Sequence, residues 1–267
     1  MSDLDLERLG ALAERAALAG GAIVEAHFGA AGNVQEKAPG DWVSDVDTAS
    51  ETAIRDLLAQ ETPEIPFFGE ESGGVRSSLE WVVDPLDGTT NFLHRFRAVG
   101  VSVALVRDGA PIVGVVHAPL LDETYRAVLG GGAFCNGTPI EVSERPPSGA
   151  IVATGFPFRH KELTPRYLAM FRAAFGSFED LRRAGAASLD LAWTAAGVFD
   201  GFFELSLGPW DVAAGALLVR EAGGVVTDWA ADPEAWLSSG NIAAGTPAVR
   251  AEIVRLAEES AADPQLS

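Results

Sequence analysis

The chain has 267 residues, 48% of them hydrophobic, and can bury a large core in one domain or in two closely joined halves. It carries 19 basic and 38 acidic residues, and its net charge of −19 repels phosphate backbones and anionic lipids. We therefore expect neither a nucleic-acid partner nor a membrane partner. A local site filled by cations could still bind an anionic small molecule.

The composition also bears on the compartment. The single cysteine, Cys135, cannot form an internal disulfide, and the acidic start MSDLDLERLG lacks the basic and apolar regions of a signal peptide. Charged residues interrupt every apolar run before it reaches the roughly 18 residues that a membrane span requires. These features predict a cytoplasmic protein.

The predicted elements alternate between helices and strands without a long linker. Apolar residues at helical spacing predict a first helix over 4–28. A polar, flexible segment follows to Gly40, and a second helix is predicted over 48–60. The middle of the chain is rich in strands and predicts an antiparallel meander built from the runs 80–84, 98–106, 112–118 and 124–130.

From residue 150 onward the rhythm changes to short strands separated by helices. Strands are predicted at 151–155, 181–185, 201–205, 224–228 and 241–245, and helices near 164–175, 188–198, 211–222 and 247–260. This alternation favours an α/β half packed on a more antiparallel α+β half. The stretch PPSG at 146–149 is the expected seam, which divides the chain into 1–147 and 148–267.

Acidic residues recur where predicted strands and helices begin or end. Asp84 and Asp87, in WVVDPLDGTTNF, follow a buried apolar run, where an isolated carboxylate is costly to desolvate. A simple turn is the alternative, because Pro, Asp and Gly all form turns. Asp211 precedes an apolar helix and could be an N-cap. Glu70 follows Phe67-Phe68 and could belong to a solvated turn.

A fifth carboxylate, Asp47, lies in SDVDTASE. Helix capping explains one aspartate there but hardly needs Asp45 and Asp47 together. Carboxylates from separate elements are the usual way to hold two or three Mg²⁺ ions. Such ions, about 3.5–4 Å apart, can hold an attacking water and a leaving oxygen in line across a phosphorus atom. If a helix begins at Gly88-Thr89-Thr90, its free N–H groups would receive a phosphate.

Three segments, FFGEES, WVVDPLDGTTNF and PWDVAAGALLVREAGG, occur in the order and spacing of one family's motifs. By these motifs the chain resembles the inositol monophosphatase family, lithium-sensitive and Mg²⁺-dependent sugar phosphatases, across nearly its whole length. The resemblance implies a layered αβαβα fold, with a mainly antiparallel N-terminal sheet and a smaller α/β C-terminal half. It also implies a homodimer and an active site between the halves.

The resemblance assigns roles to particular residues. The implied Mg²⁺ ligands are Glu70, Asp84, the backbone carbonyl of Leu86, Asp87 and Asp211. Thr89, Asp47 and Glu70 would be catalytic, and Gly88, Thr89 and Thr90 would bind phosphate. Glu204, Ala187 and Gly185 would contact the substrate, and Lys37 would lie in a mobile loop near the metals. For Glu204 and Lys37, ordinary solvated charges are the alternative.

The predicted function is hydrolysis of a phosphomonoester by a metal-activated water, with inositol 1-phosphate as the expected substrate. Fructose 1,6-bisphosphate, adenosine 3′,5′-bisphosphate, histidinol phosphate and NADP are alternatives, and a non-catalytic regulatory binding protein is a remote one. A haloacid-dehalogenase-type phosphatase requires two aspartates two apart, as in D-x-D-G-T, whereas Asp84 and Asp87 are three apart. A P-loop kinase is also disfavoured, because the chain has no Gly-Lys pair. His27, His94, His117 and His160 lack metal-ligand spacing.

Two departures from the family concern the organic part of the substrate. Ala186 stands where relatives commonly have Ser or Thr, and Gly208 stands where a lysine is frequent. A broader or different sugar phosphate is therefore also considered. Four basic residues could meet a second phosphate, with surface positions as the alternative: Arg159, Lys161, Arg182 and Arg183.

Overall fold

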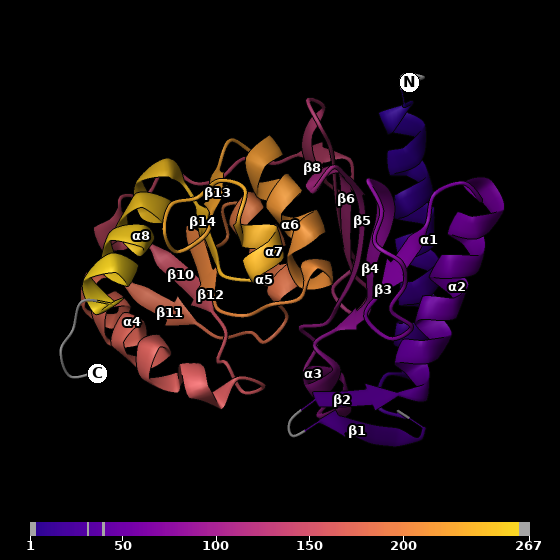
Figure 1. Cartoon of the computed structure of the whole chain (residues 1–267), viewed down its shortest axis with the longest axis horizontal. Helices are drawn as coiled ribbons and strands as arrows, with labels where there is room; N and C mark the ends of the chain where they lie inside the picture. The colour runs from indigo at the N-terminus through magenta and orange to yellow at the C-terminus, as the bar shows by residue number, and fades with distance from the viewer. Residues whose placement is uncertain (1–3, 31, 39–40, 262–267) are drawn as a thin grey trace.

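The computed structural model describes residues 4–30, 32–38 and 41–261, and these form five layers (Figure 1). A helix pair, a seven-stranded sheet, a second helix pair, a five-stranded sheet and an outer helix pair follow one another. This is the αβαβα arrangement expected from the sequence, with the larger sheet in the N-terminal half. The division at 147/148 stays a prediction.

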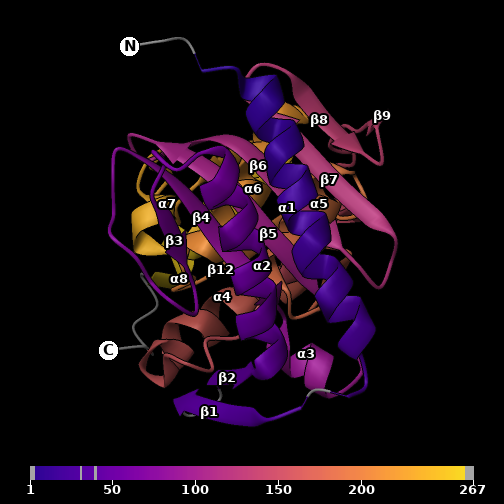
Figure 2. The same cartoon turned by 90° about the vertical axis from the view of Figure 1, so that its right-hand side faces the viewer.

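The first layer consists of α1 (Leu6–His27) and α2 (Asp45–Glu61), which lie side by side over one face of the larger sheet (Figure 2). Helix α2 begins three residues before the predicted start because Ser44 caps it. The Ser44 hydroxyl accepts the Val46 N–H at 3.2 Å, and Asp47 accepts the Ser44 N–H at 2.9 Å. This reciprocal capping box satisfies N–H groups that a helix start otherwise leaves unpaired.

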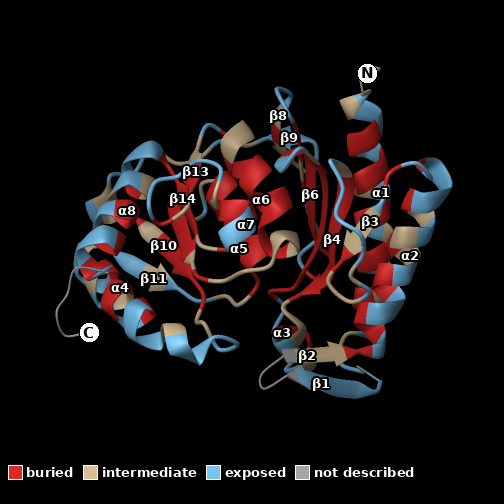
Figure 3. Ribbon diagram, viewed as in Figure 1, coloured by how far each residue is buried: buried red, intermediate tan, exposed pale blue. Residues whose placement is uncertain are grey.

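The larger sheet confirms the predicted meander and extends it at both edges. Its strands, in spatial order, are β3 (Phe67–Gly69), β4 (Leu79–Asp87), β5 (Gly100–Arg107), β6 (Ala110–Ala118), β7 (Glu123–Val128), β8 (Gly132–Cys135) and β9 (Thr138–Pro139). Only the β3–β4 pair is parallel. Because helices cover both faces, the central strands are buried almost throughout, as Figure 3 shows.

The smaller sheet has the order β11-β10-β12-β14-β13. Its strands are β10 (Ile151–Thr154), β11 (Asp180–Arg182), β12 (Gly201–Glu204), β13 (Val225–Thr227) and β14 (Ile242–Gly245). Helices α4 (Thr164–Ser177) and α8 (Pro247–Ala261) cover its outer face. The short helix α7 (Trp236–Ser239) and the 3-10 turns Pro147–Gly149 and Lys161–Leu163 complete this half.

Helices α5 (Ala187–Ala195) and α6 (Pro209–Glu221) form the central layer between the two sheets. Their many Ala and Gly residues allow close packing. At Gly114 of β6, an added Cβ would lie 2.7 Å from the Ala214 carbonyl oxygen of α6, so only glycine fits there. The start of α5 lies at the end of β4, where Ser188 donates to Asp87, and the start of α6 brings Asp211 to the same place.

One prediction about the first half was wrong. The segment expected to be a loop contains β1 (Val34–Ala38), which pairs with β2 (Asp41–Ser44) in a two-stranded antiparallel sheet. The mobility of this segment stays a prediction. The partner strand supplies the backbone hydrogen bonds, and the polar stretch VQEKA gives no local sign of this pairing. Gly40, where the predicted segment ended, lies outside the described residues. Among those that are described, no helix is long and apolar enough to cross a bilayer.

Candidate active site

A bulge at the end of β4 brings Asp84 and Asp87 into one site. Residues three apart in a regular strand point to opposite faces. Here Asp84 pairs with Ser102 and Asp87 with Gly100, so three steps along β4 match two along β5. The Leu86 N–H donates to Asp84 Oδ1 at 2.9 Å and closes the bulge. The spacing of three that the motif shows is therefore what the bulge requires.

Asp211 joins these two aspartates from the start of α6. Carboxylate oxygens of Asp84, Asp87 and Asp211 lie within 4.8 Å of one another, and all three residues are buried. Asp211 is the third residue of α6 rather than its N-cap, and it accepts the Gly208 N–H at 2.6 Å. Glu70 approaches from the turn after β3, close enough that its charge raises the pKa of Asp84.

The electrostatics of this cluster favour a bound cation. Burial raises the pKa of Asp84 and of Asp211, and the neighbouring carboxylates raise both further. Burial raises the pKa of Glu70 to about 7, against the opposing charges of Arg159 and Lys37. Buried carboxylates without cations cost free energy, and oxygen ligands of this kind suit Mg²⁺. The donor set therefore fits a hard divalent ion.

Asp87 has a partner of its own in α5. The Ser188 N–H and hydroxyl donate to Asp87 Oδ2 at 2.7 and 2.5 Å. Burial raises the pKa of Asp87, and these two hydrogen bonds oppose that rise. Ser188 thus helps to fix the orientation of the Asp87 carboxylate beside the cluster.

Thr89 and Asp47 form a hydrogen-bonded pair beside the cluster. Helix α3 (Thr89–Leu93) begins at Thr89, and Gly88 before it has a left-handed φ of 89°. The Thr89 hydroxyl donates to Asp47 Oδ1 at 3.0 Å and lies 3.2 Å from the Leu86 carbonyl oxygen. Burial raises the pKa of Asp47, and its hydrogen bonds from Ser44 and Thr89 oppose this. A hydroxyl aligned with a carboxylate in this way can relay a proton.

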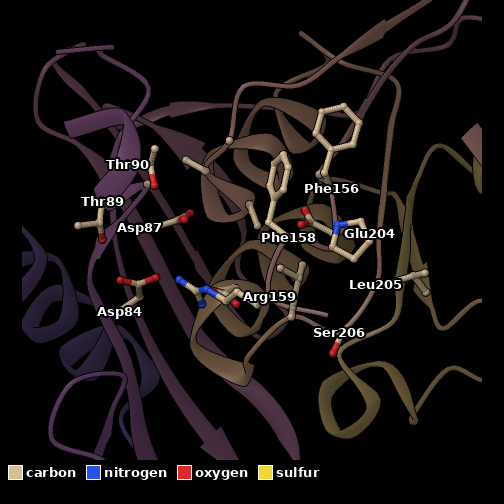
Figure 4. Close-up of a pocket in the computed structure, with 18 of the residues that line it drawn as sticks. Asp84, Asp87, Thr89, Thr90, Phe156, Phe158, Arg159, Glu204, Leu205 and Ser206 are labelled. Carbon is tan, nitrogen blue, oxygen red and sulfur yellow. The ribbon is translucent and has the colours of Figure 1, made fainter. Parts of the chain in front are cut away.

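A cavity of about 240 Å³ opens from the carboxylate cluster toward β12 (Figure 4). Most of the predicted site residues line it: Glu70, Asp84, Leu86, Asp87, Gly88, Thr89, Thr90, Gly185, Ala187, Glu204 and Asp211. Ala186 lies in the same wall. Asp47 is not part of the lining and contacts the cavity through Thr89. The structure thus brings together residues from both halves of the chain.

Glu204, which is half-buried, lies across the cavity from Asp84 and Asp87 (Figure 4). An added Cβ at Gly155 would lie 2.0 Å from Glu204 Oε1, so the carboxylate packs directly on this glycine. Burial raises the pKa of Glu204 to about 8, and the charge of Arg183 opposes the shift. The Arg183 guanidinium lies over the rings of Phe156 and Phe158, 5.5 and 5.6 Å from their centroids.

The basic residues considered for a second phosphate fall into two groups. Arg159 and Arg183 line the cavity, whereas Lys161 and Arg182 are not among its lining residues. Arg182 forms an ion pair with Asp180 at 2.5 Å. The guanidinium of Arg159 extends toward the aspartates in Figure 4, and its Nη1 lies 3.8 Å from Glu70 Oε1.

Lys37 was expected in a loop, but it lies on strand β1. Its ammonium group forms an ion pair with Glu71, the neighbour of Glu70. Burial raises the pKa of Glu71, and Lys37 opposes this through its hydrogen bond and charge. Lys37 is therefore held close to the carboxylate cluster by a strand and an ion pair.

Sequence analysis missed several residues that hold the site together. Ser44 could have been found, because Ser at 44 and Asp at 47 have the spacing of a capping box. Ser188 gives no such signal, since its partner Asp87 is 101 residues away. The Asn91 side-chain amide donates to the carbonyl oxygens of Ala98 and Ala184, at 2.8 and 2.9 Å, and so joins the two halves.

Comparison with known proteins gives a consistent family. Residues 5–262 match the inositol monophosphatase family. The Nus factor SuhB of Escherichia coli K12 is 41% identical over 255 residues, which cover 93% of this chain and 95% of that protein. The crystal structure of the extragenic suppressor protein suhB from Bartonella henselae has a TM-score of 0.90 and 37% identity, covering 94% of this chain and 99% of that one.

A second solved structure supports the same assignment. The inositol monophosphatase from Anabaena has a TM-score of 0.86 and 34% identity, covering 96% of this chain and 97% of that one. The match to the family extends over nearly all of the sequence, and the fold agrees. The chain belongs to the inositol monophosphatase family.

Proposed function

We propose that this protein is a Mg²⁺-dependent phosphomonoester hydrolase. The observation that carries the proposal is the position of the Thr89–Asp47 pair beside the buried Asp84, Asp87 and Asp211 cluster. The Thr89–Asp47 pair and the aspartate cluster meet at the start of α3, where helix N–H groups have no intrahelical partner and favour an anion. A phosphoryl group at this point would lie between metal ligands and a proton acceptor.

Two or three Mg²⁺ ions held by Glu70, Asp84, the Leu86 carbonyl, Asp87 and Asp211 would neutralise the phosphate and lower the pKa of the attacking water. Phosphate binding and proton transfer belong to residues of the chain. Gly88, Thr89 and Thr90 hold the phosphate oxygens. Thr89 accepts the water proton while its own proton passes to Asp47. As the water oxygen bonds to phosphorus, the bond from phosphorus to the ester oxygen breaks, and the leaving alkoxide takes up a proton from solvent and departs as the alcohol, so no phosphoenzyme forms.

The proposed substrate is inositol 1-phosphate. The Glu204 carboxylate would accept a hydrogen bond from a ring hydroxyl, and the small residues Gly185 and Ala187 leave room for the ring. Arg159 and Arg183, which also line the cavity, are suited to a second anionic group. Fructose 1,6-bisphosphate, adenosine 3′,5′-bisphosphate, histidinol phosphate and NADP are therefore the alternative substrates.

The direct test is phosphate release from inositol 1-phosphate and these alternatives, with Mg²⁺ or with a chelator. We expect Mg²⁺-dependent release, fastest with inositol 1-phosphate. Preference for a bisphosphate would retain the metal chemistry and shift substrate recognition to Arg159 and Arg183. A single turnover in ¹⁸O-water should place solvent oxygen in the phosphate, and trapping an aspartyl phosphate would refute direct attack.

A second candidate is a Nus factor role, favoured by the 41% identity to proteins named Nus factor SuhB. This would be a non-catalytic binding function. The two candidates are separable in a strain of Escherichia coli that lacks its own SuhB. If the Asp87→Asn variant replaces SuhB as well as the unchanged chain does, a Nus factor role independent of hydrolysis is supported.

The family resemblance leads to three further proposals. The protein would form a homodimer, which sedimentation can measure. Its phosphatase activity would be inhibited by Li⁺ at concentrations where Na⁺ has no effect. The protein would be cytoplasmic, which fractionation of the cells that make it can check.

A further inference from the structure

One face of helix α2 is tied to three segments of the active site. Asp47 accepts the hydroxyl of Thr89. Ser50 donates to the Pro85 carbonyl oxygen at 2.9 Å, within the bulge of β4. One turn after Asp47, Glu51 contacts the turn that follows β3. Residues four apart on a helix lie on the same face, so α2 presents both carboxylates in one direction.

Glu51 lies inside the turn formed by residues 69–73. Gly69 and Gly73 close this turn through two backbone hydrogen bonds, each 3.0 Å long. Glu51 Oε2 accepts the Glu71 N–H at 2.9 Å, and Oε1 accepts the Ser72 N–H at 3.0 Å. Successive N–H groups that converge in this way form a concave binding site for an anion. The Glu51 carboxylate is the anion that fills it.

The fit between Glu51 and the turn is close. Glu51 is only 3% exposed. An added Cβ at Gly69 would lie 2.3 Å from Glu51 Oε2, so glycine leaves the space that the carboxylate occupies. Arg55, one turn further along α2, lies 4.0 Å from Glu51 Oε1. The turn and the helix are therefore joined by a buried, charge-assisted contact.

This turn carries Glu70, the proposed metal ligand from the edge of the larger sheet. The Glu70 N–H donates to the Val83 carbonyl oxygen at 3.1 Å, which places Glu70 next to Asp84. The next two N–H groups along the chain are those that Glu51 accepts. The backbone is thus fixed on both sides of the Glu70 side chain, by β4 on one side and by α2 on the other.

We propose that Glu51 is a positioning residue that fixes Glu70 and thereby sets the affinity of the site for divalent cations. This inference rests on the proposed function only for the identity of the metal site. Glu51 touches neither the cavity nor the substrate, and its effect passes through the 69–73 turn. Partners that orient metal ligands typically contribute 10–100-fold in metal affinity.

The test is Mg²⁺ binding to the full chain by calorimetry, with no substrate present. In Glu51→Gln the amide has a single acceptor oxygen, so one of the two N–H groups loses its partner. We expect Mg²⁺ to bind at least about tenfold more weakly. Turnover at saturating Mg²⁺ should stay close to that of the unchanged chain, because Thr89 and Asp47 are intact.

Glu80→Gln is the matched control. Glu80 is also a buried carboxylate that caps a turn, accepting the Ser77 N–H at 2.8 Å and Arg76 Nε at 2.7 Å, but it does not line the cavity. Its variant should lose thermal stability and keep its Mg²⁺ affinity. Equal weakening of Mg²⁺ binding in both variants, or unchanged binding in Glu51→Gln, would refute the positioning role.

Glu51→Asp provides a second variant if Glu51→Gln does not fold. It keeps the charge but is one methylene shorter, so it should bind Mg²⁺ more weakly than the unchanged chain, and unchanged affinity would again refute the proposal. The proposed function and the positioning role of Glu51 can be refuted separately. A chain that binds Mg²⁺ but hydrolyses no phosphate ester contradicts the proposed function alone, and a chain that binds no divalent cation contradicts both.

Discussion

In the proposed mechanism Thr89 connects proton transfer to the metal cluster, because its hydroxyl lies between Asp47 and the Leu86 carbonyl oxygen. Removing the hydroxyl in Thr89→Val should lower kcat by at least about 100-fold, the usual contribution of a positioned proton acceptor. Mg²⁺ affinity should be nearly unchanged. Steady-state kinetics and calorimetry on the same preparation measure both quantities.

Thr89→Ser is the control for this substitution because it keeps the hydroxyl and removes only a methyl group. We expect it to retain most of the turnover. A Thr89→Val variant with normal kcat would show that the hydroxyl takes no part in proton transfer. Loss of Mg²⁺ binding in the same variant would instead make Thr89 part of the metal site.

Asp87 tests the role of the cluster itself. Asp87→Asn removes one negative charge from the group of buried carboxylates and keeps an oxygen that can accept from Ser188. We expect turnover to be lost even at saturating Mg²⁺. The metal-free variant should melt at the same temperature as the unchanged chain or higher, because one buried, mutually repelling carboxylate is gone.

Circular dichroism and phosphate release over a range of Mg²⁺ concentrations measure these effects. Asp180→Asn is the control, since Asp180 is an exposed residue of β11 whose partner is Arg182. Near-normal rates for Asp87→Asn at saturating Mg²⁺ would contradict its assignment as a ligand.

At the scale of elements, the geometry of the site depends on where β4 ends and α3 begins. Gly88 joins them in a left-handed conformation, with φ of 89°, and an added Cβ would lie 3.0 Å from the Ala98 carbonyl oxygen. Gly88→Ala should cost about 1–2 kcal/mol of stability from the backbone alone. It should also raise KM, because the start of α3 must shift where phosphate is expected to bind.

Gly109→Ala is the control that separates the loss of stability from the rise in KM. Gly109 lies in the turn between β5 and β6 with φ of 81°, and no atom lies within 4 Å of its added Cβ. It has the same backbone strain without the close contact. We expect both variants to lose stability in thermal melting, and only Gly88→Ala to raise KM. If the two variants have a similar KM, Gly88 takes no part in phosphate binding.

Local sequence patterns predicted those elements whose signals are themselves local. The apolar runs of β4 to β7 have such signals and form strands as predicted. Most motif residues from Asp84 to Thr90 line one cavity, and their assigned roles stay predictions. Strand β1 was missed because its polar residues are defined by pairing with β2. Glu51 and Ser188 were missed because their partners lie 20 and 101 residues away. Contacts between residues so far apart in the sequence depend on how the layers pack, and hydrophobic periodicity does not encode that packing.

At the scale of the whole molecule, the site lies where the two sheets face each other across α5 and α6. The larger sheet supplies Asp84 and Asp87, α6 supplies Asp211, and the smaller sheet supplies Glu204. This arrangement buries several carboxylates in one region of a chain whose net charge is already −19. The stability of the metal-free protein should therefore depend strongly on pH.

The direction of that dependence follows from the pKa shifts. Burial raises the pKa of Glu70 to about 7 and that of Glu204 to about 8. A carboxyl group with a higher pKa in the folded state binds its proton more tightly there than in the unfolded chain. Its contribution to stability is complete below the unfolded pKa of about 4 and is lost as the pH rises through the folded pKa.

With a chelator present, we therefore expect Tm to fall between about pH 5 and pH 8. Mg²⁺ binds the deprotonated carboxylates, so the increase in Tm that it causes should grow over the same interval. The double variant Glu70→Gln/Glu204→Gln keeps the general repulsion of the acidic chain and removes these two titrations, so its Tm should change less with pH. If Tm instead rises toward pH 8 with the chelator present, the charges of the buried carboxylates are compensated within the fold, without a cation.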